Sequence, residues 1–427
     1  MSEGVETVGL DTPPRLAVDR LLDDRETRII VCCGAGGVGK TTTAAALGVR
    51  AAARGRKVVV LTIDPARRLA QSMGIDSLDN TPRRVREAGQ DGGELHAMML
   101  DMKRTFDEIV EAHADAERAR AILANPFYQS LSAGFAGTQE YMAMEKLGQL
   151  RARDDWDLII VDTPPSRSAL DFLDAPKRLG SFLDGKFIRV LMAPAKVGGR
   201  AGMKFLNVGM SMMTGTLSKL MGASLLKDVQ TFVAAMDTMF GGFRTRADAT
   251  FRLLQAPGTA FLVVAAPEPD ALREAAYFVE RLAAERMPLA GLVLNRVHGS
   301  GADQLSAERA LAAAENLEDG GIVDQESGKA GLRDMAAEPP GADDDTHRDD
   351  THCDDTTTVD RITAGLLRLH AERMQVISRE QRTRDRFTSL HPEVAVAEVA
   401  ALPGDVHDLA GLRAIGERLA AGVPAGA

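Results

Sequence analysis

Cysteine is scarce in this chain, with three in 427 residues. So few cysteines cannot form a disulfide framework, and this usage is typical of a reducing compartment. A basic excess is also missing, because the net charge is −10, and a nucleic-acid partner is therefore not expected. Aromatic residues make up only 4% of the chain, whereas the 45% hydrophobic and 26% charged fractions are typical of a soluble globular protein.

Long apolar runs are missing as well. The longest uncharged stretches are residues 121–139, which contain a proline and several polar residues, and residues 205–218, which are too short to span a bilayer. The first residues have neither the basic start nor the apolar centre of a signal peptide. We therefore expect a cytoplasmic protein whose contact with membranes is at most peripheral.

Seven short apolar runs rich in β-branched residues alternate with helix-like stretches. The expected strands lie at residues 28–33, 57–63, 95–100, 158–161, 261–265, 291–294 and 394–399. Helix-like stretches include residues 41–54, 271–284 and 363–379. This alternation predicts an α/β fold with a doubly wound, mostly parallel sheet.

Two segments depart from this alternation. Residues 176–245 have no strand-like run and contain eight of the 18 methionines, which predicts an inserted α-helical subdomain. Residues 315–360 contain 15 Asp and Glu against 3 Lys and Arg, a net charge of −12, which predicts an acidic disordered insert. The other expected parts are a flexible amino-terminal arm (1–27), the core (28–175 and 246–314) and a carboxyl-terminal part of that core (361–427).

The strongest motif is a glycine-rich turn between the first expected strand and the helix after it. It runs from Gly34 to Thr42 and satisfies G-x-x-x-x-G-K-[ST], the P-loop of NTPases. Backbone amides of such a loop bind phosphate, Lys40 brings a charge to the β- and γ-phosphates, and Thr41 offers a hydroxyl to Mg²⁺. The expected nucleotide-binding residues are Gly34, Gly36, Gly37, Val38, Gly39, Lys40, Thr41 and Thr42.

Two aspartates end apolar runs and are candidates for further chemistry. Asp162 follows the run at 158–161 and is expected to hold Mg²⁺ through a water molecule. Asp64 follows the run at 57–63 and could orient the water that attacks the γ-phosphate. Either residue could instead cap the end of its strand, and the spacing alone does not separate these alternatives.

Together these motifs resemble one family. The P-loop, the segment IDPARRL (63–69) and the segment VDTPPSRSALDFLDAP (161–176) are similar to the arsenite-pump and tail-anchored-protein-targeting ATPases, a deviant P-loop group. The likeness covers most of residues 28–300 and resumes near 360–420. It is strongest to the actinobacterial branch of anion-transporting ATPases.

The resemblance implies roles for individual residues and names ATP and Mg²⁺ as the cofactors. Asp64 and Lys40 would be catalytic, with Asp64 positioning the hydrolytic water. Asp162 would belong to the second nucleotide-sensing segment. Asn295 would hydrogen-bond the adenine, and Pro403 would lie in the segment that closes over the base.

One departure from the family concerns the P-loop. The family's second lysine reaches the nucleotide of the other subunit, and Ala35 replaces it here. A homodimer would then hydrolyse ATP slowly unless Arg67 or Arg68 substitutes. A paralogue that has the lysine would complete the site of this chain.

A second departure concerns metals. The family's zinc-binding C-x-x-C pair is absent, so zinc is not expected, although His347, His352 and Cys353 in the acidic insert superficially resemble a metal site. Cys32 and Cys33 are expected to be buried in the sheet. Because arsenite-binding cysteines have no counterpart, arsenite transport is not expected.

Three functions remain open. The resemblance favours a dimeric ATP-driven switch whose helical insert binds and releases a hydrophobic client or partner protein. Ala35 favours a weakly hydrolytic regulatory subunit of a heteromeric complex. The helix expected at residues 408–421 would suit a membrane-positioning ATPase, although its small apolar face favours docking onto the sheet.

Overall fold

The computed structural model describes residues 14–63, 68–75, 77–89, 92–126, 128–129, 132, 138–164, 245–330 and 351–421. The Met-rich insert predicted over 176–245 lies outside the described residues except for its last one. Its helical character therefore stays a prediction.

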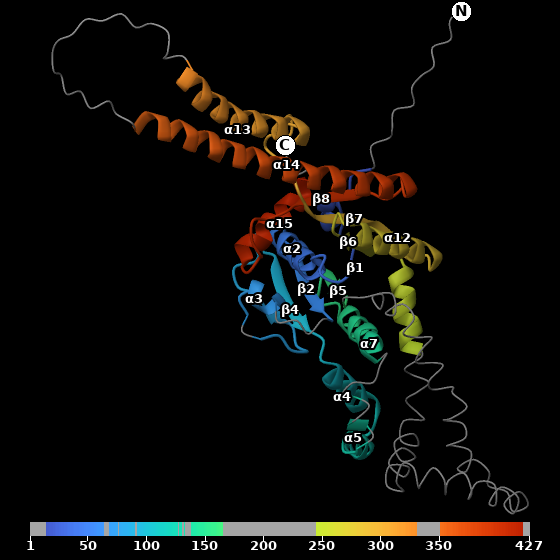
Figure 1. Cartoon of the computed structure of the whole chain (residues 1–427). Helices are drawn as coiled ribbons and strands as arrows, with labels where there is room; N and C mark the ends of the chain where they lie inside the picture. Colours follow the sequence, from blue (N-terminus) through green and yellow to red (C-terminus); the bar gives the residue numbers. More distant parts are fainter. Residues whose placement is uncertain are drawn as a thin grey trace, which may run out of the picture.

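An eight-stranded sheet forms the centre of the described chain, in the order β3-β4-β2-β5-β1-β6-β7-β8 (Figure 1). The strands are β1 (Ile29–Gly34), β2 (Lys57–Thr62), β3 (Arg83–Arg84), β4 (Glu94–Met99), β5 (Leu158–Asp162), β6 (Thr259–Ala265), β7 (Leu289–Val297) and β8 (Val396–Ala400). All neighbours pair in parallel except β3 and β4. The predicted doubly wound α/β sheet and its seven strands are confirmed; among the strands of the described residues, the two-residue β3 was the one missed.

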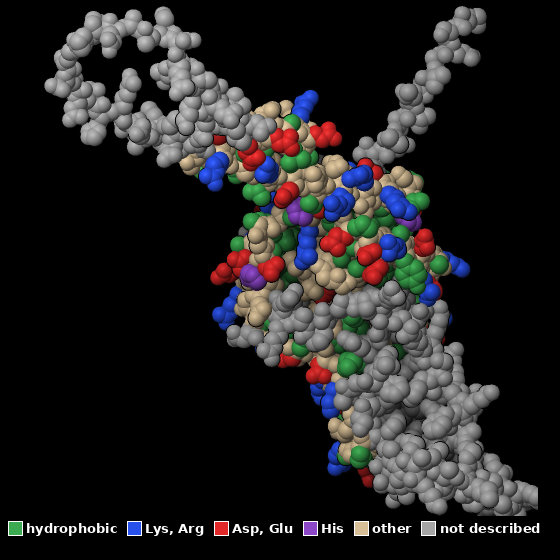
Figure 2. Space-filling model, viewed as in Figure 1, with side chains coloured by type: hydrophobic (Ala, Val, Ile, Leu, Met, Phe, Trp, Pro, Cys, Tyr) green, Lys and Arg blue, Asp and Glu red, His purple; other side chains and the backbone are tan. Residues whose placement is uncertain are grey.

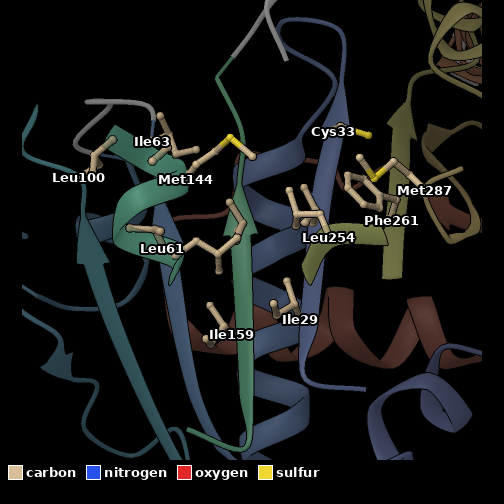
Figure 3. Packing of buried hydrophobic residues seen from close by; sticks show 14 of the residues in the cluster. Ile29, Cys33, Leu61, Ile63, Leu100, Met144, Ile159, Leu254, Phe261 and Met287 are labelled. Atoms are coloured by element: carbon tan, nitrogen blue, oxygen red, sulfur yellow. The ribbon is translucent and has the colours of Figure 1, made fainter. Parts of the chain in front are cut away.

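Helices cover both faces of this sheet. One face carries α1 (Val18–Asp23), α2 (Lys40–Ala53), α3 (Arg68–Ser72) and α15 (Leu409–Ala421). The other carries α4 (Met102–His113), α5 (Ala116–Leu123), α7 (Thr138–Arg153), helical residues 245–255, α12 (Pro269–Ala284) and the end of α14 (Thr351–Leu390). Figure 3 shows Ile29, Ile159 and Phe261 among the sheet residues that form this second core.

Helix α2 is rich in alanine because it is enclosed on both sides. It lies between the sheet and α15, and a Cβ added at Gly48 would come within 2.7 Å of Val60 Cγ2. Small side chains therefore let the helix that begins at the P-loop approach the strands closely. On the other side, α15 buries Leu412, Ile415 and Leu419, which confirms its predicted docking.

The amino-terminal arm is more ordered than predicted. The amide of Leu16 donates to Val396 O at 3.0 Å, and α1 follows. Asp19 on α1 accepts two hydrogen bonds from Arg50 of α2, at 2.5 and 2.7 Å. The flexible arm predicted over 1–27 is therefore wrong for residues 14–27, because backbone pairing and ion pairs hold them; residues 1–13 lie outside the described part.

Arg56 is the largest fully buried side chain among the residues that the structure describes. Its guanidinium donates to the carbonyl oxygens of Leu22, Asp24, Thr27 and Asp157, at 2.6 to 3.2 Å. Leu22 is in α1, Asp24 and Thr27 lie between α1 and β1, and Asp157 directly precedes β5, while Arg56 itself directly precedes β2. One side chain thus joins several segments at the sheet edge opposite the P-loop.

The acidic segment is also more regular than predicted. Helix α13 (Ala307–Ala330) and α14 form a long antiparallel hairpin that extends beyond the sheet (Figure 1). The disorder predicted over 315–360 is therefore wrong for residues 315–330 and 351–360, which are helical. Alanine packing between the two helices at Ala310, Ala314, Ala364 and Ala371 outweighs the local charge; residues 331–350 are outside the described part.

Charged side chains of both signs are interspersed over the described face in Figure 2. This matches a chain whose acidity is concentrated in one segment rather than spread over the core. Among the helices of the described residues, none is long and apolar enough to cross a bilayer.

Candidate functional site

The P-loop connects the central strand β1 to α2, where the sheet order reverses direction. Gly34 has φ +147°, and a Cβ there would lie 2.0 Å from Val264 O of β6. Gly39, the residue before α2, has φ +95°. Glycine is required at both positions because other residues rarely adopt these angles and the first has no room for a side chain.

Lys40 holds its ammonium group over the loop. Its Nζ donates to Gly34 O at 3.0 Å and to Ala35 O at 2.7 Å, and its side chain is buried. These contacts place a positive charge inside the curved backbone at the amino end of α2. Loop amides, helix dipole and ammonium then all favour a bound anion.

Asp162 ends β5 between β1 and β2, and it is fully buried. Its Oδ2 accepts hydrogen bonds from Thr41 Oγ1 at 2.7 Å and from Thr62 Oγ1 at 2.9 Å. The structure therefore brings together the two residues predicted to hold the metal. The structure also adds Thr62, which the sequence analysis missed. Thr62 lies opposite Asp162 in the pairing of β2 with β5. Aligning the carboxyl ends of these two predicted strands would therefore have identified it.

The donor set fits Mg²⁺. A threonine hydroxyl and a carboxylate are hard oxygen donors, and they lie at the phosphate-binding end of the loop, where Mg²⁺ commonly keeps waters and nucleotide oxygens as its other ligands. Within the described residues, no group of three or more His, Cys, Asp or Glu side chains is placed to hold a metal. His347 lies outside this part, and the side chains of His352 and Cys353 are not described.

Asn295 contacts the P-loop from β7. Its Nδ2 donates to Val38 O at 2.8 Å, and a Cβ added at Gly39 would come within 2.2 Å of the same nitrogen. The sequence analysis expected an adenine contact at Asn295, and that role stays a prediction. The contact with the loop backbone was not foreseen, because it depends on how closely β7 approaches across β6.

The two cysteines beside the P-loop are buried, as predicted. Burial raises the pKa of the Cys33 thiol to about 12 and that of the Cys32 thiol well above its usual value. Cys33 Sγ lies 3.6 Å from Leu262 O, on the side of the sheet that carries Phe261 and Met287 (Figure 3). Burial therefore favours the protonated form of both thiols, which is the less nucleophilic form.

Other candidates are less completely described. Asp64 and Arg67 lie outside the described residues, and Arg68 begins α3 without a described side chain. Pro403 is exposed in the loop between β8 and α15. The catalytic role of Asp64 and the base contact of Pro403 therefore stay predictions.

Ala35, at the position of the missing lysine, is 9% exposed. Its methyl group is part of the core on the α2 face. In this chain the position contributes no positive charge to the loop.

Comparison with known proteins agrees with this geometry. A model of the anion-transporting ATPase family matches residues 27–318. The chain is similar to ATPase GET3 of Podospora anserina, with 26% identity over 299 residues, which cover 68% of this chain and 80% of that protein.

Two prokaryotic relatives match over shorter regions. A putative arsenical pump-driving ATPase of Halobacterium salinarum is 29% identical over 205 residues, 45% of this chain and 31% of that protein. ATPase BagA of Mycobacterium tuberculosis is 29% identical over 168 residues, 37% of this chain and 48% of that protein. The matched regions thus span less than half of these two relatives.

Proposed function

The chain belongs to the anion-transporting ATPase family, and from that premise we propose that it is a Mg²⁺-dependent ATPase whose nucleotide state controls a binding segment for a hydrophobic protein. The observation that carries the proposal is the convergence of Lys40, Thr41 and Asp162 on one end of the P-loop. These three residues supply a charge for phosphate and two oxygen donors for the metal.

Each residue has a defined part in this proposal. The loop amides between Gly34 and Thr42 bind phosphate oxygens, and Lys40 moves from the loop carbonyls to the β- and γ-phosphates. Thr41 and Asp162 orient the metal, Asp162 through a water. Mg²⁺, when bound, neutralises charge that develops on the phosphates. Asp64 is proposed to orient the attacking water.

The chain connects this site directly to the proposed binding segment. Asp162 is followed by Thr163, whose hydroxyl donates to Cys32 O at 2.9 Å, and the chain then enters residues 165–244. Where it returns, Arg246 Nε donates to Glu145 Oε1 of α7 at 2.6 Å. A shift of Asp162 on hydrolysis would therefore act on one end of the segment while the other end stays held to α7.

A second function is favoured by Ala35. Without the loop lysine, the chain would bind ATP and hydrolyse it weakly, as a regulatory subunit beside a paralogue that has the lysine. The membrane-positioning alternative has less support, because α15 uses Leu412, Ile415 and Leu419 to pack against the core.

The test is the ATPase rate per chain, measured over a wide range of protein concentration with and without Mg²⁺. Lys40→Ala is the control, since it removes the ammonium that contacts the loop. A Mg²⁺-dependent rate that rises with concentration and vanishes in the control supports a self-sufficient dimer. Negligible turnover with intact nucleotide binding supports the regulatory subunit, whereas loss of both binding and turnover contradicts both proposals.

Ala35→Lys separates the two further. If the missing lysine limits turnover, this substitution should raise the rate by at least about 10-fold, because charges that reach the transferred phosphate contribute about 10³–10⁵ in related reactions. An unchanged rate in a chain that already turns over would indicate that Arg67 or Arg68 fills this role.

A further inference from the structure

A groove between α12 and α14 combines an apolar floor with a basic rim. Figure 1 shows α12 beside the end of α14 that leads into β8. Side chains of these two helices line the groove, whose volume is about 460 Å³. Leu272 and Phe387 are buried in its floor, whereas Leu390 is 66% exposed at its end. A large apolar side chain that stays exposed beside a groove indicates a contact surface.

The basic rim lacks an acidic partner. It consists of three exposed arginines on successive turns of α14, namely Arg379, Arg382 and Arg386. Within the ranges that the structure describes, none of the three forms an ion pair, and the carboxylates between them, Glu380 and Asp385, pair with His298 and Arg384 instead. Uncompensated positive charge beside apolar side chains favours an occupant that is both acidic and apolar.

The amino-terminal arm enters the described fold close to this groove. Arg15 pairs in parallel with Val396 of β8, whose amide donates to Pro14 O at 2.8 Å. Because the pairing is parallel, the chain before Pro14 starts at the amino end of β8, and five residues separate that end from Leu390. Thirteen residues can span about 43–47 Å, whereas the arginines and Leu390 lie within about 17 Å along α14. Residues 1–13 are therefore long enough to fill the groove.

These arm residues also match the groove in charge and polarity. Residues 1–13 contain three acidic residues and no Lys or Arg, with three large aliphatic residues interspersed. The acidic residues are Glu3, Glu6 and Asp11, and the aliphatic ones are Val5, Val8 and Leu10. Because the arm is tethered beside the groove, its effective concentration there is about millimolar, so even a weak contact is populated.

The other segments outside the described residues suit the groove less well. Residues 165–244 contain 11 Lys and Arg against 5 Asp and Glu, a net charge of +6, and residues 422–427 contain no charged side chain. Residues 331–350 are acidic, but both of their ends are held at the tip of the α13–α14 hairpin. Such a 20-residue loop reaches about 35 Å at most, whereas Arg379 lies about 42 Å along α14 from Thr351.

We propose that residues 1–13 dock in the groove between α12 and α14 of the same chain. Val8 and Leu10 cover Leu390 and the apolar floor, and the acidic residues pair with the three arginines of the rim. The docked arm ties α12 to the end of α14. This contact is separate from the P-loop and does not need ATP.

The first test is a disulfide between arm and groove in the nucleotide-free full chain, with Cys353→Ser as the background because Cys32 and Cys33 are buried. Thr383 lines the groove, so Thr7→Cys with Thr383→Cys should form a disulfide within one chain under mild oxidation. Thr7→Cys with Asp385→Cys is the matched control, since Asp385 is exposed about 200° around α14 from Thr383.

The control disulfide should form at least about 10-fold more slowly, because the docked arm holds its cysteine at the groove. Equal rates for the two pairs would show an undocked arm. A covalent dimer in place of the disulfide within one chain would show that the arm of a second copy fills the groove. Either result overturns the proposal.

The second test is the mobility of a spin label at Thr7→Cys in the same background, measured at low ionic strength. We expect an immobilised label that Arg382→Glu with Arg386→Glu releases, and that about 0.5 M salt also releases, because salt screens exposed charges. Adding Glu6→Lys with Asp11→Lys to the groove variant should immobilise the label again, since the charge pairs are restored with opposite sign.

Arg309→Glu with Arg361→Glu is the control for charge. It makes the same change at exposed positions of the α13–α14 hairpin outside the groove and should leave the label immobilised. A mobile label in the starting chain would mean that the groove takes a partner outside this chain. An immobilised label that ignores the groove substitutions would mean that the arm docks elsewhere, and either result overturns the proposal.

Discussion

Replacing Gly39 by alanine should destabilise the chain more than replacing Gly37. Both glycines have positive φ, +95° and +77°, a region that costs alanine about 1–2 kcal/mol. Only Gly39 has a neighbour: the added Cβ would lie 2.2 Å from Asn295 Nδ2, whereas nothing lies within 4 Å at Gly37. The collision displaces the amide that donates to Val38 O, and a lost buried hydrogen bond costs about 1–3 kcal/mol.

The expected loss in free energy of unfolding is therefore about 2–5 kcal/mol for Gly39→Ala and about 1–2 kcal/mol for Gly37→Ala. Urea denaturation of the nucleotide-free chain measures both. Gly37→Ala is the matched control, because it has the backbone strain without the collision.

Asn295→Ala identifies the source of the difference. In that background the Cβ at position 39 meets no amide, so the cost of Gly39→Ala should fall to about that of Gly37→Ala. The coupling energy between positions 39 and 295 should then be about 1–3 kcal/mol. Equal costs for the two glycine substitutions, or an unchanged cost in the Asn295→Ala background, would refute the reasoning.

Three further outcomes follow from the structure. Asp162→Asn should lower the Mg²⁺-dependent ATPase rate by about 100-fold or more. Its Tm should change little, because Thr41 and Thr62 can still donate to the amide oxygen. An unchanged response of the rate to Mg²⁺ would contradict the metal role. Arg56→Met should lower the free energy of unfolding by about 3–5 kcal/mol, since four carbonyls lose their donor at about 1 kcal/mol each, and urea denaturation measures it. Burial raises the pKa of the Cys33 thiol to about 12. Above the ordinary thiol pKa, the unfolded chain therefore loses a proton at this thiol that the folded chain keeps. The free energy of unfolding then falls as the pH rises. Cys33→Ala should make that fall shallower between pH 8 and pH 10, and an unchanged slope would show that other groups cause it.

The regular part of the fold could be predicted because its signals are local. Apolar runs of β-branched residues indicated β1, β2 and β5, and the glycine-rich turn after β1 located the P-loop. Asp162 was identified because it ends such a run. The P-loop and Asp162 follow the carboxyl ends of neighbouring parallel strands. Parallel pairing of those strands is therefore enough to bring them together.

Contacts that depend on how elements approach one another could not be predicted. The bond from Asn295 to Val38 joins residues that are 257 positions apart. The arm residue Leu16 pairs with β8 from the other end of the chain. Charge density along residues 315–360 indicated disorder, whereas the packing of α13 against α14 makes the flanks of that segment helical.

Arg56 holds the amino ends of the central strands, whereas the nucleotide site lies at their carboxyl ends. From its position just before β2, its four hydrogen bonds hold the residue before β5 and the segment that leads from α1 into β1. At the other end of the same strands, Asp162 and the threonines beside it rely on exchangeable hydroxyl contacts. If the proposed nucleotide switch operates, we therefore expect its movements to be larger at the carboxyl ends of these strands than at the ends held by Arg56.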